Sequence, residues 1–193
     1  MSKKHSKLNG TTAFTIIASI VFLLAAPVTS QAADCHPDQI QLQTQGAIGL
    51  GGRTVVSQTF IPSAPGQRVC RVKVFISKNA IGAGPLTLHL LGFNFAELDA
   101  AVTIPGFLIP MGNSIQVFEF GCNGAALAGM PFYGLKLESP GSAFGAYSWR
   151  GIGGNVYAKP GNGGRAWRNV KAGVGPWTNL GAFDYAFEIY MCN

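Results

Sequence analysis

The sequence predicts an all-β protein in which two antiparallel sheets pack face to face as a jelly-roll-like sandwich. Three observations predict this fold. Short segments alternate apolar and polar residues with the period of two that a half-buried strand requires. Glycine and proline turn signals separate these segments at intervals mostly too short for ordinary helices. Finally, about 160 residues follow a predicted leader, enough for one domain with its own core.

The first 32 residues have the composition of a secretory signal peptide. Three lysines within the first seven residues precede an apolar run over 13–26, and the small residues Ser30 and Ala32 follow it. We expect cleavage after Ala32, with Ala33 as a near-equal alternative. The rival interpretation, a membrane anchor, is disfavoured because a spanning helix needs roughly 20 apolar residues. We therefore expect a secreted or periplasmic protein whose single domain covers 33–193 and has no membrane span.

Alternation of apolar and polar residues marks the expected strands within that domain. The clearest stripes fall in residues 40–44, 72–76, 86–90, 133–137 and 183–191. Each predicts one buried face, and the turn signals between them predict eight to ten strands. The stretch 95–101 tolerates a helix, although one of only about two turns.

Four cysteines, Cys35, Cys70, Cys122 and Cys192, all lie after the leader. An even count in an exported chain predicts two disulfides. Three pairings are possible, and the sequence does not choose among them, although a Cys35–Cys192 bridge would join the two ends of the domain. A zinc site is disfavoured because no cysteines have the spacing of a tetrahedral site.

The charge balance argues against nucleic-acid binding. Three of the 14 basic residues leave with the leader and all eight acidic residues stay, so the mature net charge is +3. These charges form no run, whereas nucleic-acid-binding proteins usually carry a clustered basic face.

Scattered positions across most of the mature chain resemble bacterial exported jelly-roll domains. They are Ser57–Phe60, Cys70–Ile76, Gly129–Leu137, Trp149, Tyr157, Trp167 and Asp184–Phe187. In that group a Gln-x-Phe strand opens the sandwich, a Tyr-containing strand follows a mid-chain glycine, and a Trp precedes a closing Asp-x-x-Phe strand. The resemblance implies an accessory or surface module, similar in some members to carbohydrate-binding domains. The two predicted disulfides depart from the usual layout.

All three tryptophans lie between residues 144 and 184, among glycine-rich loops. A flat ring on such a loop can stack on the apolar face of a sugar while polar neighbours bond its hydroxyls. The predicted ligand-binding residues are Trp177, Trp167, Trp149, Arg150, Arg165 and Asn179. The alternative for Trp149 and Trp167 is a place in the core, where sandwich tryptophans commonly lie. Trp177 lies in a Gly-Pro-Trp-Thr-Asn loop and is the residue most expected to be exposed.

No residue pattern predicts catalysis or a cofactor. Asp184 and Glu188, on one strand face, would stand about 13 Å apart along the backbone, whereas glycoside hydrolysis needs carboxyl groups about 5 to 9.5 Å apart. The chain also lacks a Gly-x-Ser-x-Gly nucleophile motif. The sequence therefore favours a non-catalytic module that binds a glycan or a surface protein. A structural or protein-interaction module of the cell envelope is the alternative, and a hydrolase is a distant third.

Overall fold

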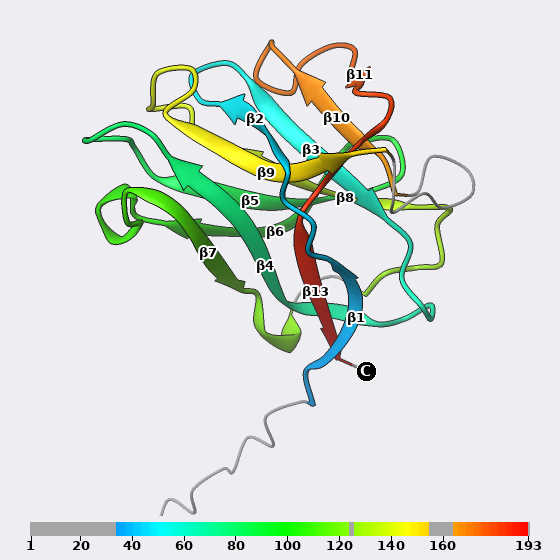
Figure 1. Cartoon of the computed structure of the whole chain (residues 1–193). Helices are drawn as coiled ribbons and strands as arrows, with labels where there is room; N and C mark the ends of the chain where they lie inside the picture. Colours follow the sequence, from blue (N-terminus) through cyan, green and yellow to red (C-terminus); the bar gives the residue numbers. More distant parts are fainter. Residues whose placement is uncertain (1–33, 124–125, 155–163, 193) are drawn as a thin grey trace, which may run out of the picture. The chain divides into compact units, whose positions relative to one another are not determined.

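The computed structural model describes residues 34–123, 126–154 and 164–192 (Figure 1). The described residues belong to one unit that spans Ala32–Asn193. The predicted leader, residues 1–32, lies outside the described residues, as do Ala33 and Tyr157.

Two antiparallel sheets contain the thirteen strands found among the described residues, more than the eight to ten expected, which confirms the predicted all-β class with two antiparallel sheets. The seven-stranded sheet has the order β1 (His36–Gln41), β13 (Phe187–Cys192), β4 (Arg68–Lys78), β9 (Tyr147–Gly153) and β12 (Phe183–Tyr185), with β2 (Gly46–Leu50) paired to β9 and β7 (Gly112–Glu119) paired to β4. The six-stranded sheet has the order β11 (Thr178–Asn179), β10 (Ala166–Asn169), β3 (Val55–Phe60), β8 (Tyr133–Glu138), β5 (Leu86–Leu91) and β6 (Glu97–Ile104).

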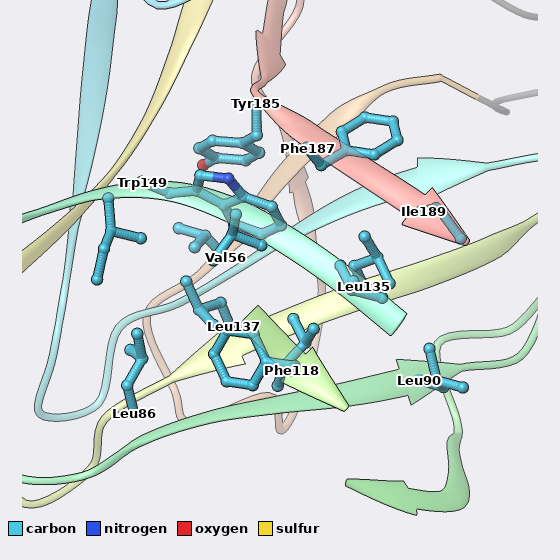
Figure 2. Close-up of a cluster of buried hydrophobic side chains, with 14 of the residues drawn as sticks. Val56, Leu86, Leu90, Phe118, Leu135, Leu137, Trp149, Tyr185, Phe187 and Ile189 are labelled. Carbon is cyan, nitrogen blue, oxygen red and sulfur yellow. The ribbon is translucent and has the colours of Figure 1, made fainter. Parts of the chain in front are cut away.

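The inward side chains of both sheets make one hydrophobic core. Figure 2 shows its centre, where Trp149 and Tyr185 of the seven-stranded sheet lie near Val56 and Leu137 of the six-stranded sheet. The rings of Trp149 and Tyr185 stack with their centroids 4.6 Å apart. The indole Nε1 of Trp149 donates a hydrogen bond to the carbonyl oxygen of Ala186 at 2.8 Å. The core thus buries the ring and satisfies its single polar group.

The longest predicted stripe, 183–191, is confirmed but is divided between two strands. β12 pairs with β9, and β13 pairs with β4. Between them, Ala186 donates its backbone N–H to Arg150 and accepts one from Phe75. The crossing requires close backbone approach, because a Cβ on Gly151 would lie 2.0 Å from the carbonyl oxygen of Asp184. Glycine at 151 therefore lets the chain pass from one partner strand to the other.

The prediction that the apolar residues of 40–44 form the buried face of a strand is wrong. Ile40 and Leu42 are exposed, whereas Gln39 and Gln41 are buried. The Gln41 side chain donates to the backbone carbonyl of Tyr185 and accepts from the N–H of Gln43. This hydrogen bond to Tyr185 of β12 satisfies a buried amide at the edge of the sheet, where β1 ends at Gln41.

Both predicted disulfides form, between Cys35 and Cys70 and between Cys122 and Cys192. The bridge considered between Cys35 and Cys192 does not form. β1 and β13 are nevertheless adjacent, because they are paired strands.

The helical elements among the described residues are the short 3-10 turns η1 (Gly106–Leu108) and η2 (Gly121–Asn123). The stretch 95–101, which tolerated a helix in the sequence, enters strand β6 instead. The described part of the chain holds no helix with the length and apolar character to cross a membrane.

Candidate functional site

Five aromatic rings gather over the outer face of the six-stranded sheet. The rings, here called the aromatic cluster, belong to Phe93, Phe95, Phe132, Trp167 and Trp177. Phe95 is central: it stacks on Trp177 at 5.1 Å between centroids and meets Trp167 edge-on at 5.1 Å. It also contacts Phe132 at 6.0 Å, and Phe132 contacts Phe93 at 4.9 Å. All four separations fall in the favourable range for aromatic pairs.

The central ring is held by an unusual backbone conformation. Phe95 has φ = +61°, a left-handed conformation that bulky residues rarely adopt. The tight turn between β5 and β6 holds it there, through hydrogen bonds from Phe95 N to Gly92 O and from Gly92 N to Ala96 O. Strain of this kind costs about 1–3 kcal/mol and persists only where the surroundings enforce it. Here it orients the ring that joins the two tryptophans.

Asn169, at the end of β10, organises the loop that carries Trp177. Its buried side-chain amide donates to the carbonyl oxygens of Gly175 at 3.2 Å and Pro176 at 3.3 Å. Its Oδ1 accepts from the backbone N–H groups of Lys171 at 2.7 Å and Gly173 at 3.3 Å. All four hydrogen-bonding positions of the amide are therefore used. One side chain fixes the loop, and the loop places Trp177 against Phe95.

A row of outward-facing residues links the cluster to a group of charges. Across the sheet, Trp167 pairs with Ser57, Ser57 with Lys136, and Lys136 with His89. The sequence neighbours of these residues point into the core, so their own side chains lie on the opposite face.

The charged group, here called the ionic network, comprises His89, Glu97, Lys136 and Glu138. Lys136 is nearly buried and bonds both carboxylates, including Glu138 at 2.9 Å. His89 Nε2 bonds Glu138 at 2.9 Å, and His89 Nδ1 is 3.3 Å from Glu97. The hydrogen bond from His89 is the main cause that lowers the pKa of Glu138 from 4.5 to about 2, with Lys136 adding to it and burial opposing it. Glu138 is therefore ionised at ordinary pH.

Two polar groups next to the rings are buried without a partner among the described residues. They are the indole Nε1 of Trp167 and the hydroxyl Oγ of Ser57, which belong to paired positions on β10 and β3. Buried polar groups are usually hydrogen-bonded, since leaving one unpaired costs about 1–3 kcal/mol. The sheet below the cluster therefore has unused capacity for hydrogen bonds.

The structure brings together some of the predicted ligand-binding residues. Trp167 and Trp177 join in the aromatic cluster, and Asn179 pairs with Trp167 across β10 and β11. Arg165 immediately precedes β10, where its backbone bonds Thr59. These four residues lie on the six-stranded sheet or at its edge.

Two predicted residues lie elsewhere. Trp149 is fully buried in the core, so its ring cannot contact a ligand on the surface, and we do not retain it as a binding residue. Arg150 belongs to β9 of the other sheet, where its guanidinium bonds the carbonyl oxygen of Thr44 at 2.8 Å and Asn113 Oδ1 at 3.2 Å. Trp149 and Arg150 therefore do not form part of the aromatic site.

Sequence reasoning missed Phe93, Phe95 and Phe132, as well as the ionic network. A local signal existed in Gly-Phe-Asn-Phe, residues 92–95, where two aromatic residues flank the centre of a turn. The charges gave no local signal, because their partners lie on three different strands. Asp184 and Glu188, considered as a pair, stand on separate strands, and Glu188 bonds Lys73 at 2.8 Å.

Within the part of the chain that the structure describes, no three His, Cys, Asp or Glu side chains are arranged to hold a metal ion. The site is thus built from rings, amides and paired charges. No protein-family model matches the chain, and no curated protein matches it significantly.

Proposed function

We propose that this protein is an exported, non-catalytic binding module that recognises glycans through the aromatic cluster. The two disulfides support an oxidising location, in the periplasm or outside the cell. The jelly-roll resemblance and the predicted leader point the same way, toward an accessory domain that acts in the envelope or the medium.

One observation supports the proposal most: the five rings are held together by direct ring contacts centred on Phe95. Trp177 is partly exposed, and Phe93 is 47% exposed, so aromatic surface remains open at the edge of the cluster. A pyranose presents an apolar face to such rings, while its hydroxyls require donors and acceptors around them. Asn179 and Arg165 lie next to Trp167 and can supply them. Preorganised rings reduce the entropy lost on binding.

The ionic network supports a non-catalytic role. A general acid for glycoside hydrolysis needs a raised pKa, so that its carboxyl group keeps a proton near neutral pH. The pKa of Glu138 is shifted in the opposite direction, and the Lys136 ammonium bonds both carboxylates of the network. These charges stabilise the sheet face on which the rings rest.

The test is a binding assay against insoluble cellulose, chitin and peptidoglycan and against a panel of soluble glycans. Trp177→Ala should weaken binding about thirtyfold or more, since truncating a tryptophan that anchors an interface typically costs about 2 kcal/mol or more. Phe144→Ala is the matched control, because Phe144 is an exposed ring outside the cluster. Equal binding by the Trp177 variant would refute the residue assignment. Failure to bind any polysaccharide would refute the ligand class.

A second candidate, a structural or protein-interaction module, is favoured by strand β7. This strand pairs only with β4 among the described strands, so its other edge has no strand partner there. Its outer face carries Ile115 and Val117, both exposed. Edge strands of this kind can pair with another chain. Light scattering after size exclusion distinguishes the two functions: a monomer that binds glycan supports the first, and a discrete oligomer supports the second.

A further inference from the structure

A concave site separate from the aromatic cluster lies between the β4–β5 loop and the β6–β7 loop. The cavity has a volume of about 630 Å³, within the range of small-molecule sites. Its walls are mainly apolar and include Ile81, Pro85, Pro105, Phe107 and Met111. It shares no lining residue with the aromatic cluster.

Backbone packing holds the two loops together and creates the cavity. A Cβ on Gly106 would lie 2.1 Å from the carbonyl oxygen of Ala83 and 2.4 Å from that of Gly84, so only glycine permits this approach. The Tyr147 hydroxyl also donates to Gly84 O at 2.7 Å. The cavity wall is therefore anchored to the core rather than to solvent-exposed loop tips alone.

One lining residue, Lys78 at the end of β4, carries a charge. The residue is only 7% exposed, and its Nζ donates to the carbonyl oxygens of Gly106 at 2.7 Å and Ile109 at 3.0 Å. An ammonium has three donors, and these two partners are neutral. Lys78 forms no ion pair with a carboxylate of the described residues. Lysines this deeply buried are almost always paired with an opposite charge.

The rim of the cavity is unusually apolar for a surface. Three of the lining residues are exposed: Ile81 by 92%, Phe107 by 84% and Met111 by about half. Exposed apolar groups clustered around a concave site indicate a binding surface, because they leave water when a ligand covers them.

We propose that this cavity binds a single-chain amphiphile with a carboxylate head, such as a medium-chain fatty acid. The ligand's carboxylate bonds the Lys78 ammonium and so supplies the negative charge that this buried lysine lacks among the described residues. The alkyl chain covers Ile81, Phe107 and Met111. The Lys78 ammonium requires a negatively charged group, and the apolar walls require an alkyl chain. A sugar lacks the alkyl chain, and an uncharged hydrocarbon lacks the charge. The proposal is independent of glycan binding.

Calorimetric titration with octanoate, decanoate and dodecanoate, each below its micelle concentration, tests the ligand class. Each buried CH₂ should tighten binding about fourfold, so dodecanoate should bind about fifteenfold more tightly than decanoate. Dodecanol should bind at least tenfold more weakly than dodecanoate, because it lacks the charge-assisted hydrogen bond. An affinity that does not depend on chain length, or equal affinity for dodecanol, would overturn the proposal.

Variants test the site. Phe107→Ser should weaken dodecanoate binding about fivefold, whereas Val174→Ser should leave it unchanged, since Val174 is 74% exposed but does not line the cavity. Lys78→Met should reduce the affinity for dodecanoate at least tenfold without reducing that for dodecanol. If circular dichroism shows that the Lys78 variant does not fold, the comparison of Phe107 with Val174 decides, and equal binding by those two variants overturns the assignment.

A membrane surface is the competing occupant. Phosphatidylglycerol vesicles that capture the protein, without saturable binding of dodecanoate, would overturn the proposal in favour of membrane docking. Dodecanoate that binds in a one-to-one ratio and releases the protein from such vesicles would support it.

Discussion

Replacing Asn169 with aspartate should loosen the loop that carries Trp177. The carboxylate keeps the two acceptor bonds from the N–H groups of Lys171 and Gly173. It loses both donor bonds and places a negative oxygen against the carbonyl oxygens of Gly175 and Pro176. Two lost hydrogen bonds at about 1 kcal/mol each, with two carbonyls left facing a negative charge, predict a loss of about 2–3 kcal/mol in the free energy of unfolding at pH 7.

Urea denaturation measures this loss, and acrylamide quenching of tryptophan fluorescence reports whether Trp177 becomes more accessible. Asn179→Asp is the matched control, because Asn179 uses its Oδ1 to accept the N–H of Gly181 at 2.8 Å, a bond that the carboxylate preserves. Weak polysaccharide binding should accompany the loss of stability in the Asn169 variant. Equal unfolding free energies for the two aspartate variants, within about 0.5 kcal/mol, would refute the role assigned to Asn169.

Three further predictions concern the core, the ionic network and a disulfide. Trp149→Phe removes the hydrogen bond to Ala186 and part of a buried ring, and should lower the unfolding free energy by about 2–4 kcal/mol in urea; a loss below 1 kcal/mol would contradict the packing described. Because the pKa of Glu138 is lower in the folded protein, its stabilisation is present above pH 4.5 and is lost as the pH falls toward 2. That contribution to the free energy of unfolding is at most about 3 kcal/mol. Glu138→Gln should therefore flatten the curve of unfolding free energy against pH between pH 2 and 4.5. An unchanged curve would refute the role assigned to Glu138. The double substitution of Cys122 and Cys192 by serine releases a 70-residue loop and should lower the free energy of unfolding by about 4 kcal/mol. A melting temperature equal to that of the wild-type protein would contradict this prediction.

The fold could be predicted because sheet burial leaves a local record in the sequence. Residues two apart on a strand share a face, so the stripes at 133–137 and 183–191 show which side of each strand faces the core. The prediction failed at β1, where Gln39 and Gln41 are buried; the Gln41 side chain bonds Tyr185 of β12, and the Gln39 side chain bonds Asp38. The order of polar and apolar residues in one strand does not reveal the hydrogen-bond partner, distant in sequence, that offsets the cost of burying an amide side chain.

The disulfide pairing could not be predicted because it depends on which strands become neighbours. Cys192 ends β13, and Cys122 follows β7; both strands pair with β4, on which Cys70 lies. Cys35 precedes β1 and bonds Cys70. Strand order thus brings all four sulfurs to one region, and only the detailed register separates the pairings.

The candidate site was predicted in part for the same reason. Trp167, Trp177 and Asn179 lie within 13 residues of one another, so their association appears in the local sequence. Phe95 reaches them only because β10, β3, β8 and β5 are consecutive in the sheet. Its positive φ is also unexpected for phenylalanine, and nothing in the sequence of the turn requires it.

The most direct test of glycan recognition by the aromatic cluster is a nuclear magnetic resonance titration of the three tryptophan indole N–H signals. The ligand is an oligosaccharide drawn from the polysaccharide that the protein binds. The signals of Trp177 and Trp167 should shift on addition of the sugar, whereas the signal of the buried Trp149 should not. A saturated complex in which neither Trp177 nor Trp167 shifts would contradict this prediction.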